Sequence, residues 1–173
     1  MNGKINVSSV FGEGSVFEVQ IPQSIVCSKN REEDDLSKTE SETYHIKAPN
    51  AHILVVDDVE TNRIVVRELL RVTHINVELA ESGEKCLELM KQKKYDMVFL
   101  DHMMPGMDGI ETLQRLKKMD ASLNKDTPII VMTANAVIGA KRMYLAEGFD
   151  DYISKPFGYV ELENIIKKYI DII

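Results

Sequence analysis

Five polar side chains with complementary chemistry stand at the ends of short apolar runs in this 173-residue chain. Asp57 and Asp58 follow HILVV, Asp101 ends MVFLD, Thr133 ends IIVMT, and Lys155 follows DYIS. Carboxylates that are held close together repel one another, so the pKa of at least one should rise unless a cation binds. A hard divalent ion relieves this repulsion, because Mg²⁺ prefers a few carboxylate oxygens together with several waters. The three acids are therefore a predicted Mg²⁺ site.

The remaining two side chains suit the oxygens of a transferring phosphoryl group. An ammonium and a hydroxyl beside a metal supply fixed donors where negative charge develops, and Lys155 and Thr133 are of these types. Asp101 is then the nucleophile and forms an acyl phosphate, while the metal and Lys155 neutralise the approaching anion. Ala134, directly after Thr133, leaves room for the group. These residues predict a site that accepts a phosphoryl group.

The segments that must position these residues alternate in period from residue 51 onward. In 60–72 the apolar residues Val65, Leu69 and Val72 have helical spacing. Ser82 is the predicted N-cap of a second helix, at 82–94. Strands that are continuously apolar indicate a parallel sheet covered on both faces. The expected fold is therefore α/β, a doubly wound five-stranded parallel sheet, and its carboxyl edge collects the polar residues. Strands are expected at 52–58, 75–80, 96–101, 128–133 and 151–154, and helices at 60–72, 82–94, 109–119, 136–147 and 159–170.

Two further segments precede this domain, which we place at 51–173. Residues 1–22 alternate apolar and polar side chains around a glycine-bearing turn at 12–14, which predicts a β-hairpin. A hairpin of this length cannot bury itself, so it is expected to be the tail of a larger domain or an element that docks on a neighbour. Residues 23–50 are rich in Ser, Glu, Asp and Lys and are read as a largely disordered linker.

Composition excludes several functions. The net charge of -7 with no clustered basic face argues against nucleic-acid binding. No apolar run approaches the roughly 18 residues that span a bilayer, so no membrane contact is expected. The opening MNGKINVSSV does not resemble a signal peptide, which predicts a cytoplasmic location. Cys27 and Cys86 lack metal-ligand spacing and are expected to be free thiols.

The quoted residues, with MMPGMDG after Asp101 and KPF at 155–157, resemble the receiver domains of two-component signalling, which have a flavodoxin-like fold. The resemblance covers 51–173. It implies that Asp101 is the phosphoacceptor and that Mg²⁺ is held by Asp58, Asp101 and the backbone carbonyl of Met103, with Asp57 in support. It also implies a switch pair of Thr133 and Tyr152, and a cis peptide between Lys155 and Pro156.

The amino-terminal piece resembles the end of a histidine-kinase ATP-binding domain, with Gly12, Gly14, Ser15 and Phe17 in its glycine pattern. The order of kinase tail, linker and receiver is similar to the carboxyl end of a hybrid sensor kinase, a class of parent protein that can be membrane-anchored. Met1 is then an artificial or secondary start. The segments that would hold ATP are absent from the given sequence. The receiver is expected to promote its own phosphorylation, and whether this makes the chain an enzyme stays open.

The implied partners are a histidine kinase and a histidine-containing phosphotransfer protein, with Asn62, Arg63 and Val66 of the first helix as the expected contact. No DNA-binding or enzymatic effector is expected after the last helix. Three alternatives stay open. An aspartate-nucleophile phosphohydrolase usually needs a general acid two residues after the nucleophile, where this chain has Met103. A protein-binding pseudo-receiver should have lost one of the polar positions. An FMN-binding protein should have a hydroxyl-rich phosphate loop after the first strand, which here is acidic.

Overall fold

In the computed structural model the described residues are 4–10, 12, 14–20, 46–119, 123–134 and 140–170. The chain divides into two compact units, Met1–Glu42 and Thr43–Ile173, which are described separately. Cys27 and most of the predicted linker lie outside the described residues, so the predictions made for them stay predictions.

The amino-terminal unit contains the expected hairpin. Strand β1 (Lys4–Val10) pairs antiparallel with β2 (Gly14–Gln20), and the register joins Lys4 to Gln20 and Val10 to Gly14. Gly12 and Gly14 have φ values of 85° and 118°, a backbone region that favours glycine. The apolar side chains of the two strands are exposed, as expected for a hairpin with too little chain to cover it: Ile5, Val7, Val10, Val16, Phe17 and Val19.

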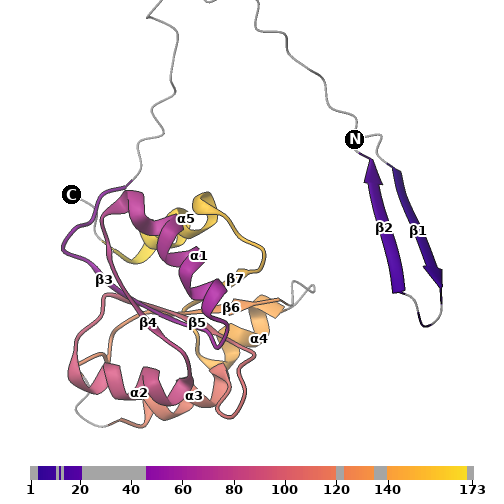
Figure 1. Ribbon diagram of the computed structural model, residues 1–173. Helices are drawn as coiled ribbons and strands as arrows, with labels where there is room; N and C mark the ends of the chain where they lie inside the picture. Colours follow the sequence, from indigo (N-terminus) through magenta and orange to yellow (C-terminus); the bar gives the residue numbers. More distant parts are fainter. Residues whose placement is uncertain are drawn as a thin grey trace, which may run out of the picture. The chain divides into compact units, whose positions relative to one another are not determined.

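The second unit is the predicted doubly wound α/β fold (Figure 1). Its five strands are parallel and lie in the order β4-β3-β5-β6-β7. Their bounds are β3 (His52–Val56), β4 (Asn76–Ala80), β5 (Met97–Asp101), β6 (Ile129–Thr133) and β7 (Asp151–Ser154). The helices are α1 (Glu60–Leu70), the 3-10 turn η1 (Arg71–Thr73), α2 (Gly83–Gln92), α3 (Gly109–Lys117), α4 (Ala140–Glu147) and α5 (Tyr159–Tyr169). Across the described ranges, no helix has the length and apolar character that a membrane span requires.

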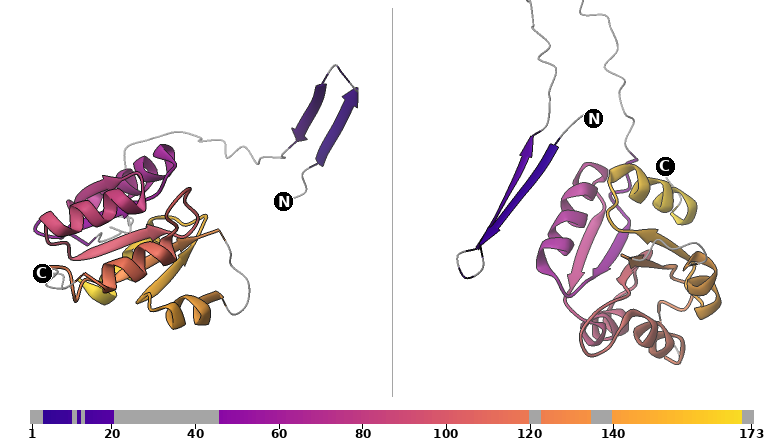
Figure 2. Two further views of the ribbon diagram at one scale, coloured as in Figure 1. Left: turned by 90° about the horizontal axis from the view of Figure 1, so that it is seen from below. Right: turned by 90° about the vertical axis from the view of Figure 1, so that its right-hand side faces the viewer.

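Helices cover both faces of the sheet, which explains why its central strands are apolar throughout. Helices α1 and α5 lie on one face, and α2, α3 and α4 lie on the other (Figures 1 and 2). Every residue of β5 and β6 is buried. Along β3 the side chains alternate, so that Ile53 and Val55 pack with α1 and α5, while Leu54 and Val56 pack with α2 and α3.

The buried residues of α1 are not the helically spaced set from which the helix was predicted. Val66 and Leu70 are buried, whereas Val65 and Val72 are 48% and 41% exposed. The segment carries two apolar sets one residue apart, and packing against the sheet and α5 selects the set that periodicity alone did not favour. The expectation that Val66 contacts a partner protein is therefore wrong, because its side chain belongs to the core.

Helix α2 begins as predicted. The Ser82 side chain accepts a hydrogen bond from the Lys85 backbone N–H at 3.2 Å, so Ser82 is the N-cap. Cys86 of the same helix is a buried free thiol, as expected, and burial raises its pKa to about 12. It is therefore an apolar core side chain and not a reactive group.

Residues 46–50, which the sequence assigned to the end of the linker, belong to the second unit and pack against the rest of it. The Ile46 N–H donates to the Glu163 carboxylate at 2.9 Å, and the Ala48 N–H donates to the Thr73 carbonyl at 2.9 Å. Ile46 and Ala48 are both buried beside α1 and α5. The body of the unit thus includes a short lead-in to β3 whose few apolar residues gave no periodic signal.

Candidate functional site

Three carboxylates meet at the carboxyl edge of the sheet, where the strand order reverses. The chain passes from β3 outward to β4 and then back past β3 to β5, so β3 and β5 flank the crevice in which such sheets bind ligands. Asp57 directly follows β3 and Asp101 ends β5; both are buried, while Asp58 is exposed. Each of the three acids offers an oxygen within 4.8 Å of the others. Oxygen donors in this number and spacing suit a hard divalent cation.

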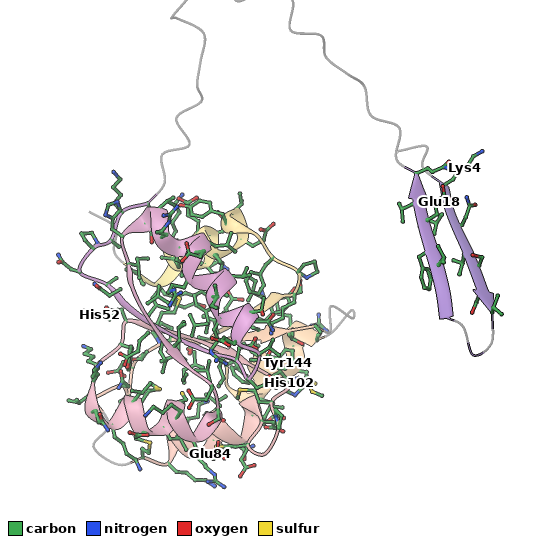
Figure 3. The ribbon with its side chains drawn as sticks, in the orientation of Figure 1. Lys4, Glu18, His52, Glu84, His102 and Tyr144 are labelled. Carbon is green, nitrogen blue, oxygen red and sulfur yellow. The ribbon has the colours of Figure 1, made fainter. Side chains whose placement is uncertain are left out.

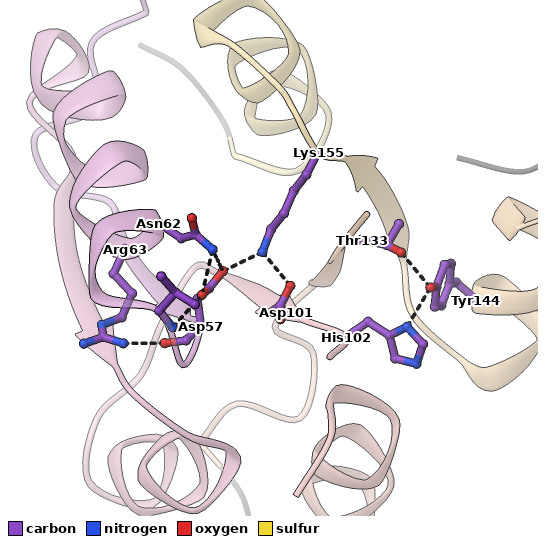
Figure 4. Close-up of polar contacts among 9 residues, drawn as sticks. Asp57, Asn62, Arg63, Asp101, His102, Thr133, Tyr144 and Lys155 are labelled. Atoms are coloured by element: carbon purple, nitrogen blue, oxygen red, sulfur yellow. Dashed lines mark hydrogen bonds and ion pairs between the residues drawn. The ribbon is translucent and has the colours of Figure 1, made fainter. Parts of the chain in front are cut away.

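Lys155 joins the two buried acids. Its Nζ lies 2.6 Å from Asp57 Oδ2 and 2.6 Å from Asp101 Oδ1 (Figure 4). Burial raises the pKa of Asp101, and the neighbouring charges of Asp57 and Asp58 add to the increase that the Lys155 ammonium only partly offsets. Burial opposes the charge of Lys155, but its hydrogen bonds to both carboxylates outweigh this and raise its pKa. The ammonium is therefore the positive charge that compensates the acids.

The backbone around Lys155 fixes where the ammonium points. The Lys155 N–H donates to the Thr133 carbonyl at 2.7 Å, one step beyond the pairing of Thr133 with Ser154. The Lys155-Pro156 peptide bond is cis, as the resemblance implies. Strand pairing thus carries Lys155 past the end of β6 and toward the acids.

Side chains of α1 hold Asp57 in place. Asn62 Nδ2 donates to both Asp57 oxygens, at 3.0 and 3.1 Å, and the Val59 N–H donates to Asp57 Oδ1 at 2.9 Å. Arg63 Nη1 donates to the backbone carbonyls of Asp57 and Asp58 at 2.5 and 3.0 Å. Asn62 and Arg63, expected to face a partner protein, therefore also shape the acidic site.

The loop after Asp101 folds tightly against the strand end. Gly106 has φ 78°, which accounts for glycine after Pro105. The Gly109 N–H donates to the His102 carbonyl at 3.0 Å, and a Cβ at Gly109 would overlap the backbone oxygen of Asp101. The Met103 side chain is 70% exposed. The sequence MMPGMDG thus builds a close turn at the rim of the acidic site.

The Thr133 hydroxyl takes part in a hydrogen-bonded chain that the sequence did not reveal. Thr133 Oγ1 lies 2.9 Å from the Tyr144 hydroxyl of α4, which lies 2.9 Å from Nδ1 of His102. Tyr144 looks in the sequence like an ordinary core aromatic, and the only hint at His102 is its place directly after Asp101.

Tyr152, the predicted switch partner of Thr133, is half-buried on β7 opposite Val131, with Lys141 Nζ 5.7 Å from its ring centroid.

The chain is similar to proteins of known classes along most of its length. The family model for the response regulator receiver domain matches residues 53–167. The aerobic respiration control sensor protein ArcB of Escherichia coli (strain K12) is 35% identical over 171 residues, which is 99% of this chain and 21% of ArcB. The sensor histidine kinase AruS of Pseudomonas aeruginosa is 31% identical over 166 residues, 96% of this chain and 16% of AruS. This chain therefore spans about a fifth or less of the length of these two relatives.

Solved structures agree with these matches. The receiver domain of sensor histidine kinase PA1611 from Pseudomonas aeruginosa, described with a magnesium ion coordinated in its active-site cleft, has a TM-score of 0.62 and 29% identity over 69% of this chain and 96% of that chain. The chemotaxis protein CheY4 of Vibrio cholerae has a TM-score of 0.63 and 27% identity over 69% of this chain and 98% of that chain. With the parallel sheet and the grouped acids already described, these matches show that the chain belongs to the response regulator receiver domain family and is homologous to the receivers of hybrid histidine kinases.

Proposed function

We propose that this chain is the receiver of a phosphorelay and that Asp101 accepts the phosphoryl group in a Mg²⁺-dependent reaction. The observation that carries the proposal is the arrangement of Asp57, Asp58 and Asp101 within 4.8 Å of one another, with Lys155 bonded to two of them. Asp101 is the best placed nucleophile, because it ends the central strand β5 beside the topological switch point.

In the proposed reaction a carboxylate oxygen of Asp101 attacks the phosphorus of a phosphohistidine. The new P–O bond forms as the P–N bond breaks, and the bonding electrons leave with the imidazole nitrogen, which takes up a proton. Lys155 then stabilises the charge on the phosphoryl oxygens, and the Thr133 hydroxyl donates to one of them. Thr133 and Tyr152 together form the proposed switch that reports the phosphorylated state.

The donor set fits magnesium. Asp58, Asp101 and the backbone carbonyl of Met103 are the proposed ligands, with Asp57 in support, and all are oxygen donors. When bound, the ion would supply positive charge that offsets the negative charge of the carboxylates and of the phosphoryl oxygens. Asn62 donates hydrogen bonds to both carboxylate oxygens of Asp57. It therefore supports the site without being a proposed ligand of the ion.

The proposed donor is a histidine kinase, and the proposed acceptor is a histidine-containing phosphotransfer protein. Because Val66 is buried, we place the docking surface at the exposed apolar side chains of α1 and its start, Val59, Ile64 and Val65.

The proposed place of action is the cytoplasm. The amino-terminal hairpin is proposed to be the last part of a kinase ATP-binding domain, since its apolar side chains are exposed.

Incubation with acetyl phosphate and Mg²⁺, followed by intact mass measurement, tests the proposal. We expect the parent chain to gain one phosphoryl group and Asp101→Asn to gain none. A matched assay with p-nitrophenyl phosphate separates the alternatives: steady release of phosphate with no covalent adduct indicates a phosphohydrolase. No adduct and no release indicates a protein-binding pseudo-receiver and contradicts the proposal.

A further inference from the structure

A chain of hydrogen bonds connects the proposed switch hydroxyl to helix α4 and to the residue after the phosphoacceptor. Tyr144 Oη lies 2.9 Å from Thr133 Oγ1 and 2.9 Å from His102 Nδ1 (Figure 4). Tyr144 has no exposed surface, and Thr133 is 1% exposed, so water does not replace these bonds. Figure 3 labels Tyr144 of α4 and His102 next to each other, in agreement with this contact.

Packing holds the Tyr144 ring in this position. Its ring meets the His102 ring edge-on with centroids 5.3 Å apart, and it meets the Phe149 ring edge-on at 5.9 Å. The backbone of His102 is fixed as well, because its N–H donates to the Met132 carbonyl at 3.0 Å and its carbonyl accepts from the Gly109 N–H at 3.0 Å. The Tyr144 hydroxyl is therefore held between two fixed partners.

The number of protons that each group can donate sets the direction of these hydrogen bonds. Each hydroxyl has one proton to donate, and a neutral imidazole can donate or accept at Nδ1 according to its tautomer. If Thr133 donates its proton to a phosphoryl oxygen, the bond between Thr133 and Tyr144 survives only when Tyr144 donates to Thr133. Tyr144 must then accept from His102, so Nδ1 of His102 carries a proton.

We propose that Tyr144 and His102 are positioning residues for phosphoryl transfer: the chain from His102 Nδ1–H through Tyr144 to Thr133 directs the Thr133 proton toward the phosphoryl group on Asp101. This inference rests on the proposed function. In this proposal neither residue contacts the phosphoryl group. They act by preventing Thr133 from donating its proton to Tyr144. The same bonds tie α4 to the state of Asp101.

Initial rates of phosphorylation by acetyl phosphate at saturating Mg²⁺, followed by intact mass, test the inference on the full chain. Tyr144→Phe keeps the ring and removes the hydroxyl, and it should slow the reaction about fivefold to tenfold, the change expected for one ordinary hydrogen bond. In a Thr133→Ala background the same substitution should have no further effect, because the proton it directs is gone. Tyr95→Phe removes another buried hydroxyl, which bonds Glu78 at 2.8 Å, and should leave the rate unchanged.

Variants of His102 add a rescue that a purely structural role would not produce. His102→Asn places an amide that can donate near the position of Nδ1, and it should keep a rate close to that of the parent. His102→Leu should be as slow as Tyr144→Phe. A parent rate in Tyr144→Phe, or an equal loss from that substitution in the Thr133→Ala background, overturns the inference.

A measurement on the unsubstituted chain avoids any defect in folding. The ¹⁵N resonances of His102, recorded with Mg²⁺ and the acyl-phosphate analogue beryllium fluoride bound, should show Nδ1 as the protonated nitrogen. An unprotonated Nδ1 in that state overturns the inference. If the parent gains no phosphoryl group, the proposed function fails and the inference falls with it; if the parent gains one and Thr133→Ala is slow while Tyr144→Phe is not, the inference alone fails.

Discussion

Replacing Asp101 by Asn should stabilise the metal-free protein while abolishing stable phosphorylation. The change removes one of three carboxylates that lie within 4.8 Å of one another. The Asn side chain has nearly the same shape and keeps an oxygen that can accept the hydrogen bond from Lys155. What changes is therefore mainly the charge at this one position.

The magnitude follows from the distances. At an effective dielectric constant of about 20, each repulsion at the outer limit of 4.8 Å amounts to about 3.5 kcal/mol, and the attraction of Lys155 across 2.6 Å amounts to about 6.4 kcal/mol. At that limit the two repulsions exceed the single attraction by about 0.5 kcal/mol, and any shorter separation between the carboxylates increases the difference. Water screens the part due to exposed Asp58, whereas burial of the Asp101 carboxylate adds a cost in the same direction. The raised pKa of Asp101 has the same sign, since its neutral form is favoured in the fold.

Thermal unfolding with a chelator present measures this effect. A gain of about 1 kcal/mol should raise Tm by roughly 4 °C for a domain of this size. Asp126→Asn is the matched control, because it removes one negative charge from an exposed position on the turn before β6. Added Mg²⁺ should raise the Tm of the parent more than that of Asp101→Asn, since the variant has lost a proposed ligand. A metal-free Asp101→Asn no more stable than the parent would refute the crowding argument.

Three further predictions concern the site and its surroundings. Met103→Asn places a polar group near the acyl phosphate that can orient water, so phosphate loss after removal of the donor should be several-fold faster than in the parent; equal or slower loss contradicts this. Asn62→Ala removes the support of Asp57 and should weaken Mg²⁺ binding about tenfold in a calorimetric titration, whereas an unchanged affinity argues against that role. Burial opposes the charge of Asp151, yet the hydrogen bond from Lys168 at 2.7 Å, the hydrogen bond from the Tyr152 N–H and the positive charges of Lys168 and Lys141 together outweigh it and lower the pKa of the carboxyl. Asp151→Asn should therefore cost about 1–2 kcal/mol in urea unfolding at neutral pH, a loss that fades below about pH 4 as the parent carboxylate is protonated; an equal loss at about pH 3 refutes it.

The strands and the acidic edge could be predicted because their signals are local. Each central strand is a short continuous apolar run, and parallel pairing then places the strand ends at one edge of the sheet. Asp57 and Asp101 come together for this reason alone. Crowding of the acids is expected to raise the pKa of at least one of them, and the pKa of Asp101 is raised.

The features that the sequence did not reveal depend on packing between distant segments. Val66 and Val65 are equally apolar, and only the orientation of α1 on the sheet decides which is buried. Tyr144 meets Thr133 because α4 packs beside β6, and nothing in the spacing of the two residues announces that contact. The lead-in at Ile46 is fixed by Glu163, a residue more than a hundred positions away.

Locating the phosphoryl group on the chain tests the central claim most directly. The parent is phosphorylated with acetyl phosphate and Mg²⁺, and borohydride then reduces the acyl phosphate to an alcohol, which survives proteolysis and sequencing by mass spectrometry. The proposed mechanism predicts that the reduced side chain is at position 101, and that omitting Mg²⁺ abolishes it. Reduction at Asp57 or Asp58, or a phosphoryl group that resists borohydride, would contradict the assignment of Asp101 as the nucleophile.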